Sequence, residues 1–222
     1  MAIKTDREYR DFKNFSLIET RAEEDGDGSK IVEGYASTFD VYDLYEFKFD
    51  GVREVYREQI ARDAFTDTDM SDVVFLRDHE GQVFARTKNG LIALTVDDNG
   101  LFTRTDLSKT AGALEMFEDI KAKNYTQMSF AFTSDRDKET WTEERDGDVV
   151  VYTRTIGRIK KIYDISAVGF PANPNTDISP ATRSIFDGEI EKLRAERREA
   201  EQRARARAAL ALKIKLSRRD ET

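Results

Sequence analysis

The chain of 222 residues lacks cysteine altogether and contains a single histidine, His79. Without cysteine there can be no disulfide bond, no thiolate nucleophile and no cysteine-ligated zinc. One histidine cannot make a multi-histidine metal site, so zinc-peptidase chemistry has little support. A lone imidazole can still act as a general base, because its ordinary pKa of about 6.5 lies close to working pH.

Long apolar runs are also missing. Residues 1–20 are polar and charged and lack the apolar core of a signal peptide, and no stretch approaches the length of a membrane span. The simplest compartment is the cytoplasm of the producing cell. Hydrophobic residues make up 39% and charged residues 36% of the chain, and the net charge is -8. An acidic chain argues against general nucleic-acid binding, and the large charged share indicates a solvated segment.

Short alternating apolar runs between about residues 15 and 170 are typical of strands. The predicted strands are 15–19, 31–36, 73–77, 90–96, 101–106, 126–133, 149–155 and 158–168. Turn-forming sequences at 24–28, 97–100 and 146–148 are expected to join neighbouring strands. Apolar residues at helical spacing predict two helices, at 56–65 and 109–123. This pattern favours an α+β, mainly β fold, a closed or nearly closed antiparallel barrel with helices packed outside.

The composition changes after Pro180, where an Ala/Glu/Arg-rich run begins. Ser184–Asp187 fits a capping box, and the run to Leu216 predicts one long helix. Residues 189–222 hold 11 basic and 7 acidic residues, so they carry +4 and the preceding 188 residues carry -12. We therefore divide the chain into an N-terminal extension (1–14), a main domain (15–183) and a charged helical tail (184–222). The tail is either a solvated helix or a basic arm that docks on an acidic partner.

Three residues could together form a serine-hydrolase site, although each has an ordinary alternative. His79 follows a predicted strand and precedes Gly81, as a surface histidine also would. Ser129 alternates with Met128 and Phe130, which places it either beside a substrate or on a solvated face. Asp164 stands in an apolar strand, where it either orients a histidine or faces water at an edge. A serine becomes a nucleophile only beside a base that a third group holds in place, and this chain supplies all three types.

Several segments, taken in order, resemble the prohead proteases of tailed bacteriophages, which share a fold with herpesvirus assemblin. They are Gly34–Phe39, Glu58–Phe65, Leu76–Glu80, Met128–Phe132 and Asp164–Ala172. Glu58–Phe65 resembles the family's short helix that ends in an Ala-Phe pair. Leu76–Glu80 resembles the segment that carries the family's catalytic histidine, and Met128–Phe132 resembles the segment that carries its nucleophilic serine. In the last segment aspartate stands where the family commonly has glutamate.

The resemblance implies a serine endopeptidase in which Ser129 attacks, His79 takes its proton and Asp164 holds the imidazole. Such proteases act inside the immature capsid in the host cytoplasm. They cleave scaffold segments from capsid precursor proteins and often cleave themselves, without a metal or organic cofactor. The partners expected on this basis are the capsid precursor with its scaffold segment and a second copy of the chain, with no membrane and no specific nucleic acid.

Two other functions fit the sequence. A catalytically silent scaffold or capsid-assembly module would keep the same barrel and cleave nothing. A small barrel that binds a peptide or ligand would leave His79 and Ser129 far apart. Ser166, which shares a strand face with Asp164, is an alternative nucleophile that we rank below Ser129.

Overall fold

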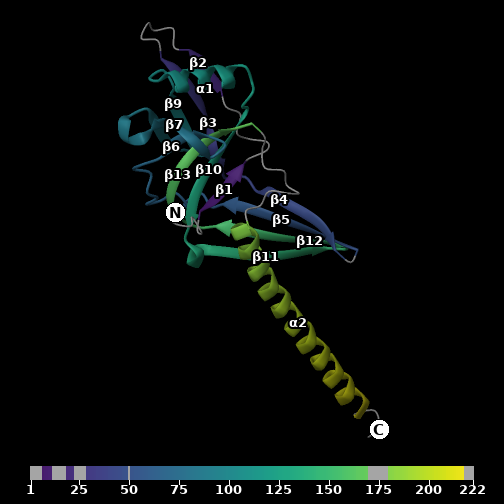
Figure 1. The fold of residues 1–222 in the computed structure, drawn as a ribbon. Coiled ribbons are helices and arrows are strands. Elements are labelled where there is room, and N and C mark those ends of the chain that lie inside the picture. The colour runs from purple at the N-terminus through teal and green to yellow at the C-terminus, as the bar shows by residue number, and fades with distance from the viewer. Residues whose placement is uncertain (1–6, 12–18, 23–28, 50, 170–179, 218–222) are drawn as a thin grey trace. The chain divides into compact units, whose positions relative to one another are not determined.

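The computed structural model describes residues 7–11, 19–22, 29–49, 51–169 and 180–217 (Figure 1). The chain forms two compact units, Met1–Ala181 and Thr182–Thr222. All strands of the described part lie in the first unit, and the described part of the second unit is helical. The chain is mainly β, as predicted.

The strands of the first unit form three sheets. Sheet A has the order β1 (Glu8–Asp11), β10 (Gln127–Ser134), β13 (Ile159–Val168), β6 (Val74–Arg77), β7 (Glu80–Arg86). Sheet B has the order β2 (Glu19–Ala22), β3 (Lys30–Thr38), β9 (Gly100–Asp106), β8 (Ile92–Val96). Sheet C has the order β11 (Glu139–Asp146), β12 (Val149–Ile156), β5 (Val52–Ile60), β4 (Tyr42–Phe49). Two short 3-10 turns, η1 (Thr87–Asn89) and η2 (Arg136–Lys138), connect strands.

The expected closed barrel is not what the described residues form, because each of the three sheets is open at both edges. Two pairs of neighbouring strands are also parallel and not antiparallel: β13 with β6, and β12 with β5. The edge strand β11 alternates between partly buried and exposed residues and ends in the charged run Glu143–Asp146. Such charges discourage further strand pairing, which is how an open sheet avoids edge-to-edge association.

The structure confirms seven of the predicted strands within one or two residues at each end, as β3, β6, β8, β9, β10, β12 and β13. The turns at 97–100 and 146–148 join antiparallel neighbours, as expected. Of the strand expected at 15–19, only Glu19 lies in the described residues, and it begins β2. The turn at 24–28 and the prolines Pro171 and Pro174 lie outside them.

The helix predicted at 56–65 is wrong, because Val52–Ile60 is the strand β5. Tyr56 and Ile60 are buried at helical spacing, but Glu54, Val55 and Glu58 are buried as well. The buried face of β5 carries the charged Glu54 and Glu58, whereas Arg53 and Arg57 on its other face are partly exposed. Polar residues therefore occur on both faces, and the strand lacks the alternation of apolar and polar residues that would distinguish it from a helix. The family resemblance to a short helix over Glu58–Phe65 fails for the same reason, although Ala64 and Phe65 do pack into the core.

The second predicted helix is confirmed as α1 (Ala111–Lys121). Thr110 caps its N-terminus, where its hydroxyl accepts a hydrogen bond from the amide of Ala113. The face that periodicity assigned to the core is buried, with Ala113, Met116, Phe117 and Ile120 all at 3% exposure or less. This face joins a core that draws on all three sheets and includes Met128, Phe130 and Phe132 of β10.

The described part of the second unit belongs to the helix α2 (Pro180–Ser217), which begins four residues before the predicted capping box. Proline suits the first turn of a helix, because the amide hydrogen that it lacks has no partner there. Ser184 therefore lies inside the helix and does not cap it. Pairs such as Lys192–Glu189 and Arg203–Glu199 lie one turn apart along the surface.

Candidate active site

His79 lies in the tight turn between β6 and β7, as its position at the end of a predicted strand implied. Arg77 pairs with Glu80, so Asp78 and His79 are the two central residues, with φ of 46° and 61°. Both are in the left-handed region, which asparagine and glycine normally occupy in such turns. The turn is fixed by hydrogen bonds from the Asp78 amide to the Ala167 carbonyl at 3.0 Å and from the Gly169 amide to the Asp78 carboxylate at 3.1 Å.

The structure brings the three predicted site residues together. His79 Nδ1 lies 2.5 Å from Asp164 Oδ1, and His79 Nε2 lies 2.5 Å from Ser129 Oγ. The imidazole thus bridges the carboxylate and the hydroxyl, with one ring nitrogen for each. The interpretation of a ligand-binding barrel, which required His79 and Ser129 to lie far apart, is wrong.

Asp164 and Ser129 stand on adjacent antiparallel strands, and a β-bulge sets their relation. Ser129 pairs with Ser166 and Ala131 with Asp164, but Phe132 pairs with Ile162, so Tyr163 is the extra residue. A bulge re-aims the neighbouring side chains, and here it lies directly beside the carboxylate. The Asp164 side chain is only 4% exposed, which is tolerable for a carboxylate because His79 and Ser166 both contact it.

Ser166 also belongs to this cluster of contacts, with its Oγ 3.3 Å from His79 Nδ1. Its hydroxyl donates to Asp164 Oδ1 at 3.0 Å and accepts from the backbone amide of His79 at 3.2 Å. It therefore ties the carboxylate to the turn that carries the histidine. The sequence placed Ser166 on the same strand face as Asp164, and that signal was sufficient to predict the contact.

Ser129 is fully buried, so the alternative of a solvated strand face is wrong. Besides His79, its hydroxyl contacts the backbone carbonyl oxygen of Arg10, to which it donates at 2.8 Å. Arg10 belongs to β1, which pairs with β10 so that Asp11 faces Ser129. The ring of Tyr9, the preceding residue, packs edge-on against the imidazole of His79 with centroids 4.7 Å apart. These contacts could not be predicted from the sequence.

An open cleft reaches this constellation from the side of β6, β7 and β13. It is bordered by His79 and Asp164, by apolar Val74, Leu76 and Val83, and by the basic side chains of Arg7, Arg86 and Lys161. Ser129 does not border it. In the part of the chain that is described, no group of three or more histidine, aspartate or glutamate residues is arranged to hold a metal ion.

A protein-family model described as caudovirus prohead serine protease matches residues 16–189, well over half of the chain. The chain belongs to this family. Comparison of the chain with curated proteins and with solved structures found no match. Membership of this family implies that the protein is of the serine-peptidase class and that its substrate is a capsid precursor. No helix among the described residues is long and apolar enough to span a membrane.

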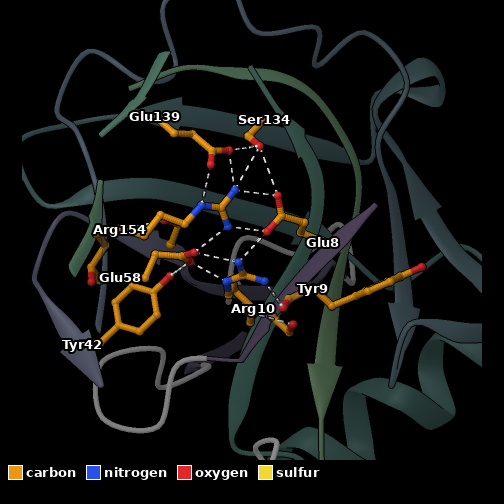
Figure 2. Close-up of polar contacts among 11 residues, drawn as sticks. Glu8, Tyr9, Arg10, Tyr42, Glu58, Ser134, Glu139 and Arg154 are labelled. Carbon is orange, nitrogen blue, oxygen red and sulfur yellow. Dashed lines mark hydrogen bonds and ion pairs between the residues drawn. The ribbon is translucent and has the colours of Figure 1, made fainter. Parts of the chain in front are cut away.

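A buried network of charges lies on the other side of β1 in this prohead protease (Figure 2). Arg10 contacts Glu58 and donates to Glu8 at 2.6 Å. Arg154 donates to Glu8 at 2.5 Å and to Glu58 at 2.9 Å, and it also pairs with Glu139. The side chains of these five residues are at most 4% exposed. The network therefore joins β1 to three strands of sheet C without contact to water.

The pKa values in this network follow from its charges. Burial by itself would raise the pKa of the Glu8 carboxyl, but the positive charges and hydrogen bonds of Arg10 and Arg154 hold it well below its ordinary value. Burial and the neighbouring Glu58 carboxylate raise the pKa of the Tyr42 hydroxyl, which contacts Glu58. The carboxylates likewise hold the pKa values of the Arg10 and Arg154 guanidinium groups above their ordinary range, although burial alone would lower them.

Proposed function

We propose that this prohead protease is an active serine endopeptidase whose catalytic residues are Ser129, His79 and Asp164. The observation that carries the proposal is the continuous chain of contacts from hydroxyl to imidazole to carboxylate, with both distances at 2.5 Å. Nucleophile, base and orienting group are defined by this geometry and not by their order in the sequence. The strained turn of His79 supports the same view, because left-handed non-glycine residues persist where their position is needed.

In the proposed reaction His79 Nε2 takes the hydroxyl proton as Ser129 Oγ attacks the carbonyl carbon of the scissile peptide. The imidazolium gives that proton to the leaving amine, and an acyl-enzyme remains. A water molecule then attacks the ester, again with His79 as base, which releases the new carboxyl terminus and restores the hydroxyl. Asp164 holds the Nδ1 hydrogen throughout, so the tautomer with a free Nε2 lone pair is favoured.

The substrates we propose are the scaffold segments of the capsid precursor, and the enzyme itself in a late step inside the prohead. The rival function, a catalytically silent assembly module, has no need of the three-residue constellation or of the strained turn.

We also propose that the tail binds an acidic partner inside the prohead. Its residues 202–219 include seven basic and no acidic side chains, so the positive charge is concentrated in the second half of α2. A chain truncated after Arg183 should then enter procapsids less efficiently than the whole chain.

The test is the intact mass of the protein and of a co-expressed capsid precursor. The wild type should yield discrete fragments, and Ser129→Ala should leave both chains whole. Ser71→Ala, which alters an exposed serine, is the matched control and should cleave like the wild type. Equal cleavage by wild type and Ser129→Ala would assign the activity to another residue. Absence of cleavage in both under assembly conditions would favour the silent module.

A further inference from the structure

The strand that carries the nucleophile has one edge on which another chain can pair, and β1 occupies it. In sheet A, β10 lies between β13 and β1, and β13 pairs with β6 on its far side. An extended peptide commonly binds a protein by adding a strand to a sheet edge. A substrate that runs along Ser129 in this way must therefore take the place of β1 (Figure 1).

β1 also contacts the nucleophile and the base directly. The carbonyl oxygen of Arg10 accepts the Ser129 hydroxyl, and the Tyr9 ring lies against His79. A serine hydroxyl has one hydrogen, so a hydroxyl that donates to Arg10 cannot donate to His79 Nε2 at the same time. All contacts are then satisfied only if His79 Nε2 carries a hydrogen and donates it to Ser129, a state in which Nε2 cannot act as the base.

Alternate residues of β1 anchor it. Tyr9 faces the imidazole, whereas Glu8 and Arg10 face the opposite side and enter the buried charge network (Figure 2). They bring one negative and one positive charge, so their departure leaves the net charge of the network unchanged. Arg154, Glu58 and Glu139 would remain in place. They could then form ion pairs with charged side chains of a substrate strand that pairs with β10.

We propose that β1 is an internal pseudosubstrate strand, which covers Ser129 until a substrate peptide with charged alternate residues replaces it on β10. This inference rests on the proposed function, because it concerns access to the same nucleophile. It makes the protein a self-inhibited enzyme whose resting state is set by four residues near its N-terminus.

The absence of cysteine allows a reversible lock on the full chain. Tyr9 and Ala131 are paired in register, and paired residues of antiparallel strands have Cα atoms about 4.5–5.5 Å apart, within disulfide range. In the double variant Tyr9→Cys/Ala131→Cys, reaction of Ser129 with diisopropyl fluorophosphate is followed by intact mass in oxidised and reduced protein. The oxidised form should react at least about tenfold more slowly, because reactivity scales with the open population. Equal rates in the two forms overturn the proposal.

A second variant does not depend on the lock. Glu8→Gln/Arg10→Met removes both anchoring charges and keeps the net charge, so Ser129 should react about tenfold faster than in the wild type. A rate no faster than wild type overturns the proposal even if the cysteine variant fails to fold.

Each protein with Ser129→Ala added controls for labelling elsewhere. If the capsid precursor is cleaved but neither variant changes the rate, only the pseudosubstrate is wrong. If no protein reacts and the precursor stays whole, the proposed function fails as well.

Discussion

Replacement of Arg154 by methionine tests whether the buried charges are held by one another. Arg154 is fully buried and contacts Glu8, Glu58 and Glu139, so the variant leaves three buried carboxylates with Arg10 as their only guanidinium partner in the network. Removing one partner of a buried ion pair costs about 3–5 kcal/mol. A second route gives a similar figure: protonating one carboxyl of ordinary pKa 4.5 at pH 7 costs about 3.4 kcal/mol.

Measuring the free energy of unfolding at pH 7 and at pH 5 separates the electrostatic cost of Arg154→Met from its packing cost. At pH 5 the same protonation costs about 0.7 kcal/mol, so the loss of stability in Arg154→Met should shrink by about 2–3 kcal/mol. Urea unfolding followed by the fluorescence of Trp141, the only tryptophan, gives the free energies, and this residue pairs with Arg154 across β11 and β12.

Arg53→Met is the matched control on the neighbouring strand of the same sheet. Arg53 pairs with Glu46 at side-chain exposures of 55% and 49%, so its loss should cost less than about 1 kcal/mol at either pH. An Arg154→Met loss that is equally large at pH 7 and pH 5 would refute the electrostatic reasoning and point to packing instead.

Three further outcomes are expected. Asp164→Asn should lower kcat about 10³–10⁴-fold with little change in stability, because an amide favours the wrong imidazole tautomer, and precursor cleavage assays measure this. Ser166→Ala should lower kcat about tenfold and shift the pH–rate profile, since Asp164 loses a donor; an unchanged profile would leave Ser166 a purely structural role. The folded pKa of Glu8 lies below its unfolded value of about 4.5, so its contribution to stability is complete above that pH and is lost progressively as the pH falls below it. Urea unfolding from pH 7 to pH 3 should show this decline, and a smaller one in Glu8→Gln.

Strands with one polar face, and the helix α1, could be predicted because their periodicity is visible in the sequence. The strand β5 could not, since its buried face includes the charged Glu54 and Glu58, of which Glu58 is paired inside the protein. The open sheets could not be predicted either, because strand spacing does not specify which strands pair in parallel.

The single histidine and a carboxylate inside an apolar strand made His79 and Asp164 candidates, and the resemblance of Met128–Phe132 to the family's serine segment selected Ser129. The same reasoning applied to Arg154, which follows Val149–Tyr152 in an equally apolar strand, would have indicated the charge network. Glu8 and Arg10 carried no such signal, because a short charged segment near a terminus looks like a solvated extension. Its burial depends on partners that lie 48 to 146 residues away.

The pairing of the first strand with the tenth has a consequence for biosynthesis. Glu8 meets Arg154 across 146 residues of chain, and Arg10 meets Ser129 across 119. At about 5–20 residues per second, β1 leaves the ribosome roughly 7–30 s before its last ionic partner exists. β1 therefore waits without its partner strand until β10 has been made, and its ionic anchors are complete only once Arg154 has followed.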